Sequence, residues 1–157
     1  MSRAIDLIIT YRVVKILVTP WKRMEAFKRG IIDEKGKNLI PMKKVRYGDK
    51  KHYTMLHRFC FNLKRILQKV GLGSRLGGFA VALALLIKED RSFYKHKDQI
   101  EAGVINYLKE NNLYEELLSE SKDVPEIEET PYITCFGVDV FEREGKLISE
   151  FEYAKTL

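Results

Sequence analysis

Polar side chains at helical spacing form the strongest candidate for a binding surface in this sequence. Arg58, Asn62, Arg65 and Lys69 follow one another at intervals of four, three and four residues, which places them on one face of a helix with Lys64 beside them. Cations spaced along one helix face can contact successive phosphates of a nucleic acid or an anionic lipid surface. The alternatives are a solvated face whose long side chains cover apolar neighbours, or a contact with another protein. We call these five residues the cationic stripe and treat it as a polyanion-binding or interface surface.

A second candidate lies near the start of the chain. Residues 4–18 are rich in Ile and Val, and a tryptophan with flanking cations follows them. This combination is typical of an in-plane amphipathic membrane anchor. The alternative, which the width of the apolar face favours, is that the segment docks on the other helices or on another subunit. The residues of this membrane or docking segment are Ile8, Tyr11, Lys15, Trp21, Lys22 and Arg23.

No sequence pattern indicates catalysis, a metal site or a cofactor site. The glycine cluster at 71–78 follows a helical stretch rather than a strand and lacks the Gly-Lys-Ser/Thr ending of a nucleotide-binding loop. The three histidines and two cysteines lack the spacing of a metal site. Cys60 and Cys135 each lie in an apolar pattern, which predicts buried thiols and a reducing compartment. We therefore expect a protein that is not an enzyme and that binds no metal or cofactor.

The net charge of +6 conceals a division between the two halves of the chain. Residues 1–75 contain 19 Lys and Arg against 5 Asp and Glu, a net charge of +14, whereas residues 76–157 contain 9 against 17, a net charge of −8. Such an asymmetry indicates that one end faces a polyanion or an acidic protein, or that copies of the chain stack basic end on acidic end. Both interpretations favour interaction over small-molecule chemistry.

The hydrophobic pattern predicts a mainly helical α+β fold. We expect helices over 4–18, over about 18 residues from His52, over 76–88, and over 97–119 with an interruption at Asn111. The helices at 52–88 form a central helical hairpin, in which 76–88 is buried because it is apolar almost all round. Leu7, Tyr11, Val14 and Val18 are expected to form the apolar face of the first helix.

The expected domains are a basic helical domain at 1–118 with its N-terminal amphipathic segment, an acidic linker at 119–130, and a C-terminal β-hairpin at 131–157. Residues 31–40 suggest a small hairpin or an extended arm, and residues 41–51 a loop. Because two strands alone are marginally stable, the C-terminal hairpin must lie on the helices, pair with residues 31–40 or complete a sheet with a neighbouring chain. The longest apolar run, 79–87, is far too short to span a bilayer.

Two stretches of the sequence resemble a family of short virion-associated proteins of tailed bacteriophages. They read YRVVKILVTPWKRMEAFKRGIIDEKGKNL and YTMLHRFCFNLKRILQKV, followed by a glycine turn and an alanine-rich helix that ends in Lys-Glu, and the resemblance covers residues 11–89. It implies a particle component, made in the host cytoplasm, that is used in many copies. The implied roles are an internal protein ejected with the genome, which forms a ring or tunnel, or a head-to-tail connector. The implied partners are further copies of the chain, other virion proteins, double-stranded DNA and the host envelope membrane; a small DNA-binding regulator is the alternative from another class.

Overall fold

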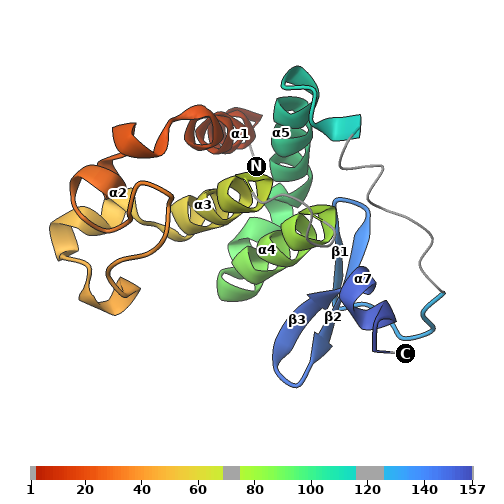
Figure 1. Cartoon of the computed structure of the whole chain (residues 1–157). Coiled ribbons are helices and arrows are strands. Elements are labelled where there is room, and N and C mark those ends of the chain that lie inside the picture. The colour runs from red at the N-terminus through yellow and green to blue at the C-terminus, as the bar shows by residue number, and fades with distance from the viewer. Residues whose placement is uncertain (1–2, 69–74, 116–125, 157) are drawn as a thin grey trace.

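The computed structural model describes residues 3–68, 75–115 and 126–156 of the chain. Four longer helices form its body, and a small antiparallel sheet lies at the C-terminal end (Figure 1). This arrangement confirms the mainly helical α+β fold. The helices are α1 (Arg3–Val18), α3 (Met55–Gln68), α4 (Arg75–Glu89) and α5 (Lys97–Glu110), and the strands are β1 (Ile133–Cys135), β2 (Val138–Arg143) and β3 (Lys146–Ser149).

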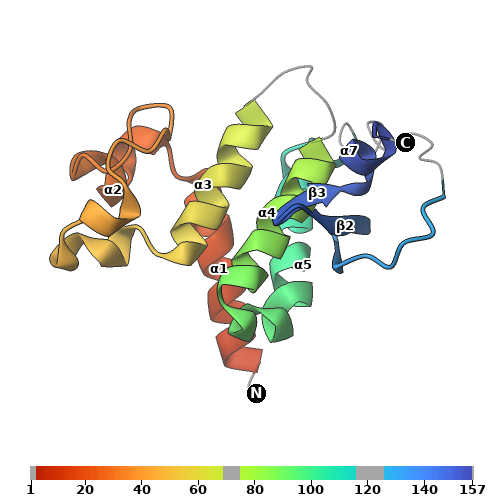
Figure 2. The ribbon, with the colours of Figure 1, turned by 90° about the horizontal axis from the view of Figure 1, so that it is seen from below.

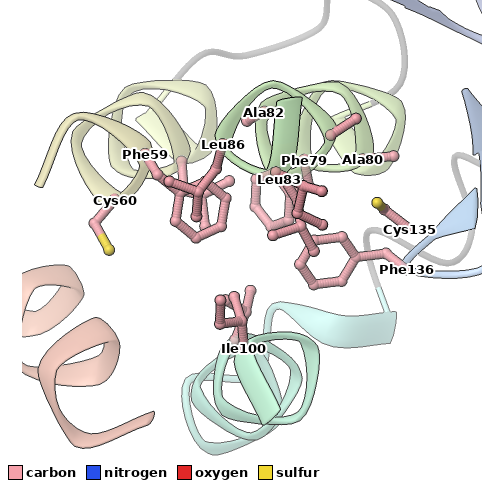
Figure 3. Packing of buried hydrophobic residues seen from close by; sticks show 14 of the residues in the cluster. Phe59, Cys60, Phe79, Ala80, Ala82, Leu83, Leu86, Ile100, Cys135 and Phe136 are labelled. Carbon is pink, nitrogen blue, oxygen red and sulfur yellow. The ribbon is translucent and has the colours of Figure 1, made fainter. Parts of the chain in front are cut away.

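Helix α4 is the centre of the main core, as its nearly continuous apolar sequence predicts. It packs against α3 on one side and against the sheet on the other, and residues of α5 reach the same cluster. In Figure 3 the side chains of Phe79 and Leu83 point from α4 toward Ile100 of α5 and Phe136 in the turn between β1 and β2. The rings of Phe79 and Phe136 meet edge to face with their centroids 6.0 Å apart. The predicted central hairpin of α3 and α4 is therefore confirmed.

Helix α3 begins at Met55 rather than near His52. The reason is local, because the hydroxyl oxygen of Thr54 accepts a hydrogen bond from the backbone N–H of His57 at 3.3 Å, as a helix N-cap does. The residues before it form a separate 3₁₀-helix, η3 (Tyr47–His52).

Helix α1 forms as expected but presents a different face to the core. Tyr11 and Val18 are 66% and 55% exposed, whereas Val13 and Leu17, one helical turn apart, are buried. These two residues face α3 and α5, the helices against which α1 packs. The predicted face was wrong because both sides of this Ile/Val-rich segment are apolar, and only the position of the neighbouring helices selects one.

The C-terminal segment contains three strands rather than a hairpin. A turn with positive φ at Phe136 (53°) and Gly137 (73°) divides the expected first strand into β1 and β2, and Glu144 and Gly145 form the second turn. The expected end of the last strand is instead the helix α7 (Glu150–Ala154). It begins there because the hydroxyl of Ser149 accepts a hydrogen bond from the backbone N–H of Glu152 at 3.3 Å.

The sheet packs on α4 and shares its core. Of the three expected arrangements, the observed one is therefore that in which the C-terminal strands lie on the helices. Cys135, Val138, Val140 and Leu147 belong to the same buried cluster as the four long helices. Gly77 allows the close approach, because a Cβ atom there would lie 2.9 Å from Cδ2 of Phe151 and 3.0 Å from Oγ of Ser149. No described strand pairs with the outer edges of β1 and β3.

Residues 21–53 form a second unit, which we call the basic lobe, with its own buried cluster. The lobe contains η1 (Trp21–Arg23), α2 (Glu25–Lys28), η2 (Met42–Lys44) and η3, together with a single bridge between Ile32 and Asn38. The expected loop at 41–51 is thus largely 3₁₀-helical. Phe61 of α3 inserts into the cluster, with its ring centroid 5.6 Å from that of Trp21. The cluster comprises Trp21, Met24, Ala26, Ile31, Ile32, Val45, Tyr53 and Phe61.

The basic lobe and the sheet lie at opposite ends of the molecule, with the helices between them (Figures 1 and 2). Most of the expected acidic linker at 119–130 falls outside the described residues; residues 126–130 are in neither a helix nor a strand. Among the described residues, no helix is both long enough and apolar enough to cross a membrane.

Candidate functional site

The basic lobe carries the largest concentration of exposed cations in the described chain. Residues 21–53 contain 11 Lys and Arg against 4 Asp and Glu, a net charge of +7. Its outermost part is formed by two 3₁₀-helices, on which Tyr47 is 91% exposed. We call this the η2–η3 surface; it comprises Lys43, Lys44, Arg46, Tyr47, Lys50 and Lys51, all exposed. Exposed cations around an unpacked aromatic ring are typical of a surface that contacts a nucleic acid.

The opposite end of the molecule is acidic. Residues 126–156 contain 8 Asp and Glu against 3 Lys and Arg, a net charge of −5. Glu142 forms an ion pair with Lys88 of α4 (2.9 Å) and Glu129 one with Arg143 (3.5 Å). The remaining exposed carboxylates of this acidic end include Glu126, Glu128, Glu144 and Glu152. The charge division along the sequence is therefore a charge division in space, because the two segments lie at opposite ends of the fold.

The cationic stripe is only partly assembled as expected. Arg58, Asn62 and Arg65 lie together and line a cavity of about 140 Å³ between α3 and α4. Arg58 forms an ion pair with Glu89 at 3.3 Å, its side chain is only 25% exposed, and its Nε atom is buried without a hydrogen-bond partner. Arg65 donates to the side-chain oxygen of Asn62. These groups bind each other and α4, so little of the stripe faces solvent as free charge; Lys69 lies outside the described residues.

Lys64 is not part of the same surface. Its ammonium group donates a hydrogen bond to the carbonyl oxygen of Leu17 at 2.9 Å and lies 5.3 Å from the centre of the Trp21 ring. Burial lowers the pKa of Lys64. This side chain therefore joins α3 to the end of α1, which is a structural role.

The residues of the N-terminal membrane or docking segment also fall into a buried group and an exposed group. Trp21 is 7% exposed in the basic lobe, where its indole N–H donates to Oε1 of Gln68 at 3.2 Å, so it is not an interfacial ring. Lys22 and Arg23 are exposed, as are Tyr11 and Lys15, and the side chain of Ile8 is outside the described part. The burial of Trp21, together with that of Val13 and Leu17, supports docking of the segment on the remaining helices.

Tyr11, Lys15 and Arg23 line a cavity where α1 docks against the basic lobe and α3, which we call the seam cavity. It has a volume of about 430 Å³ and lies between α1, the basic lobe and the start of α3. Its lining also includes Arg12, Ile16, Thr19, Met24, Glu25, Ala26, His52, His57 and Phe61. The cavity thus combines apolar walls with a cationic margin drawn from segments far apart in the sequence.

The histidines of the seam cavity are held in a partly buried environment. Nδ1 of His57 lies 2.7 Å from the hydroxyl oxygen of Thr54. Burial, together with the charges of Arg12 and His52, lowers the pKa of His57 to about 4. The ring is therefore neutral at pH 7. Nε2 of His52 is buried without a hydrogen-bond partner.

The two thiols are inert packing groups, as their sequence pattern predicts. Cys60 and Cys135 are both free and buried. Burial raises the pKa of Cys60 far above its usual value and that of Cys135 to about 12, so neither forms a thiolate near neutral pH. Within the described ranges, His, Cys, Asp and Glu side chains nowhere gather in a group of three that could hold a metal ion.

Sequence reasoning did not single out Arg12, His52 or His57 as members of one site. Arg12 lies 40 residues before His52, and it meets the two histidines only because α1 docks beside the lobe. Tyr47 was also missed, although a tyrosine among five cations in the stretch PMKKVRYGDKK is a detectable signal.

Comparison of the chain with protein-family models, with curated proteins and with solved structures finds no match.

Proposed function

We propose that this protein is a non-enzymatic structural component of a tailed-phage virion, an internal or ejection protein whose copies assemble into a ring or tunnel for genome delivery. The protein would be made in the host cytoplasm and carried in the virion, with other virion proteins as neighbours and the host envelope as its site after ejection. The observation that carries the proposal is the placement of the basic lobe and the acidic end at opposite ends of one small fold. The resemblance of residues 11–89 to short phage proteins supports the assignment to a phage virion.

Opposite charges at opposite ends favour a head-to-tail contact between copies. In such a heterologous contact the basic lobe of one copy meets the acidic end of the next, and repetition closes a ring when the rotation between copies allows it. Electrostatic complementarity determines orientation and speeds association more than it adds affinity. High salt should therefore slow the association of the copies, whereas any apolar contacts between them should be insensitive to salt. A head-to-tail connector would use the same contact and is the alternative within this class.

A second function has an observation of its own. The η2–η3 surface places exposed Tyr47 among five cations, and this arrangement suits stacking and phosphate contacts with DNA. A small DNA-binding regulator would use this surface without forming a large oligomer. An ejection protein that touches the packaged genome would use it as well.

The test is the solution mass of the nuclease-treated protein, measured by light scattering coupled to size exclusion at low and high salt. We expect a homo-oligomer of ring size. Two charge-reversed variants sharpen the test: Lys43→Glu with Arg46→Glu on the basic lobe, and Glu126→Lys with Glu128→Lys at the acidic end. Each should reduce assembly alone, and an equal mixture of the two should restore mixed contacts. A monomer at all salt concentrations that becomes large only with added DNA would contradict the assembly proposal and support the regulator.

A further inference from the structure

The seam cavity has the size and the lining of a small-molecule site. Its volume of about 430 Å³ falls in the range of about 300–1,000 Å³ found for ligand pockets in proteins. The apolar part of the lining, which we call the apolar wall, consists of Ile16 of α1, Met24 and Ala26 of the basic lobe, and Phe61 of α3. A ligand there would bury an apolar body of about one ring system or a short chain against this wall.

The charge at the margin of the cavity is almost entirely positive. Arg12, Lys15 and Arg23 line it, and Arg12 and Arg23 form no ion pair with any described residue. Glu25 is the single carboxylate in the lining, and it is already paired with Lys28 at 3.7 Å and with Arg29 at 3.4 Å. The cations at the seam are therefore available to an external anion. Guanidinium groups match the geometry of phosphate oxygens and bind them with charge-assisted hydrogen bonds.

One polar atom of the cavity lining has no hydrogen-bond partner in the protein. Nε2 of His52 is buried with no hydrogen-bond partner, and His52 is part of the cavity lining. A buried polar atom of this kind normally has a partner, which a bound ligand atom can provide. His57 contributes a neutral ring that has its Nδ1 occupied by Thr54.

We propose that the seam cavity binds a small organic phosphate: a phosphate monoester held by Arg12, Arg23 and Lys15, with its apolar body against Phe61, Met24 and Ile16. Both a mononucleotide and a single-chain lipid phosphate have this chemistry. The cavity shares no residue with the η2–η3 surface or the acidic end, and of its three cations only Arg23 belongs to the basic lobe, so binding at this site can be tested separately from the proposed assembly. Because α1, the basic lobe and α3 all contribute to the lining, the ligand would also bind these three elements together.

The test is isothermal titration of the full-length protein with three probes: AMP, n-octyl phosphate and inorganic phosphate. We expect one site per chain for AMP or for octyl phosphate, with binding at least tenfold tighter than that of inorganic phosphate. Arg12→Gln and Arg23→Gln should each weaken it by about tenfold, since each removes a charge-assisted contact. Both side chains are exposed, so the variants should keep the fold, which circular dichroism verifies. The matched control is Arg46→Gln, which makes the same charge change on the η2–η3 surface.

Each outcome decides the proposal. Weaker binding in the Arg12 and Arg23 variants, with unchanged binding in the Arg46 control, supports the proposal. The probe that binds identifies the source of the phosphate. Equal binding of inorganic phosphate would contradict the role of the apolar wall. Equal weakening by Arg46→Gln would show general charge attraction rather than a site. Absence of binding of all three probes at millimolar concentration would also overturn the proposal.

Discussion

Lys64 of α3 donates a hydrogen bond from its ammonium group to the carbonyl oxygen of Leu17, in the last turn of α1, at 2.9 Å. The same group lies over the ring of Trp21. One cation thus satisfies a helix-terminal carbonyl and joins three segments: α1, the basic lobe and α3. A residue that resembles part of a charged binding surface in the sequence therefore stabilises the fold.

The role of Lys64 gives a first prediction. Lys64→Met keeps the length of the side chain but removes the hydrogen bond and the cation–π contact, and we expect a loss of about 1–2 kcal/mol in the free energy of unfolding. Urea denaturation followed by the fluorescence of Trp21 measures it. Lys51→Met, on the exposed η2–η3 surface, serves as the control and should change stability by less than about 0.5 kcal/mol. If the two variants were equally stable, Lys64 would have no structural role.

A second prediction concerns Gly36, which lies against the ring of Trp21. A Cβ atom there would lie 2.4 Å from Cη2 of the indole, and φ at Gly36 is 81°. We expect Gly36→Ala to cost about 2–4 kcal/mol, from the backbone conformation and from the clash together. Thermal and urea unfolding provide the measurement.

Gly145→Ala is the matched control for the Gly36 variant. Its φ is 79°, yet nothing lies within 4 Å of the Cβ position. The Gly145→Ala variant should lose only the free energy that the backbone conformation costs, about 1–2 kcal/mol. Equal losses of stability in the two variants would mean that the packing of Trp21 on Gly36 contributes nothing to the cost of the Gly36 substitution.

The sequence predicts those elements whose burial is decided locally. The apolar run of α4 is buried on nearly every side, so no partner had to be known to place it in the core. The regular spacing of Leu56, Phe59, Cys60 and Leu63 likewise marked the buried face of α3, and all four are buried. In α1, however, apolar residues occur on both sides, and the positions of α3 and α5 choose Val13 over Tyr11.

The candidate sites depend still more on contacts between distant segments. At 100° per residue, a helical wheel places Lys64 about 120° from Arg58, so spacing alone could have separated Lys64 from the cationic stripe. The pairing of Arg58 with Glu89, 31 residues later, was not available from the sequence. The basic lobe is held by Trp21, Tyr53 and Phe61 from three separate stretches. No local pattern predicts such a cluster, and the seam cavity beside it was equally hidden.

A third prediction follows from the two thiols. Because burial raises the pKa values of Cys60 and Cys135, we expect both to react with a disulfide reagent at pH 8 at least about a hundredfold more slowly than an exposed cysteine. Both should react at once in guanidinium chloride. A Lys51→Cys variant provides the exposed thiol as an internal reference. Rapid labelling of the native protein would contradict the packing of β1 or α3 in the core.

The last prediction concerns the pH dependence of stability through His57. The ordinary pKa of histidine is 6.5, and in the fold burial lowers that of His57 to about 4. Between these values the unfolded chain binds a proton that the folded chain does not. The contribution of His57 to the free energy of unfolding is therefore complete above pH 6.5 and is lost as the pH drops toward 4. Since water still reaches part of the ring, we expect a loss of about 1–2 kcal/mol from this group.

Comparison with His57→Gln isolates that contribution, because the carboxylates that titrate in the same range are common to both proteins. Urea midpoints should be measured at intervals from pH 7.5 to pH 4. The difference in stability between the parent and the variant should shrink steadily as the pH falls, since only the parent loses stability through this ring. A difference that stays constant with pH would mean that His57 takes up its proton as easily in the folded chain as in the unfolded one, and would place the ring in water rather than at the wall of the seam cavity.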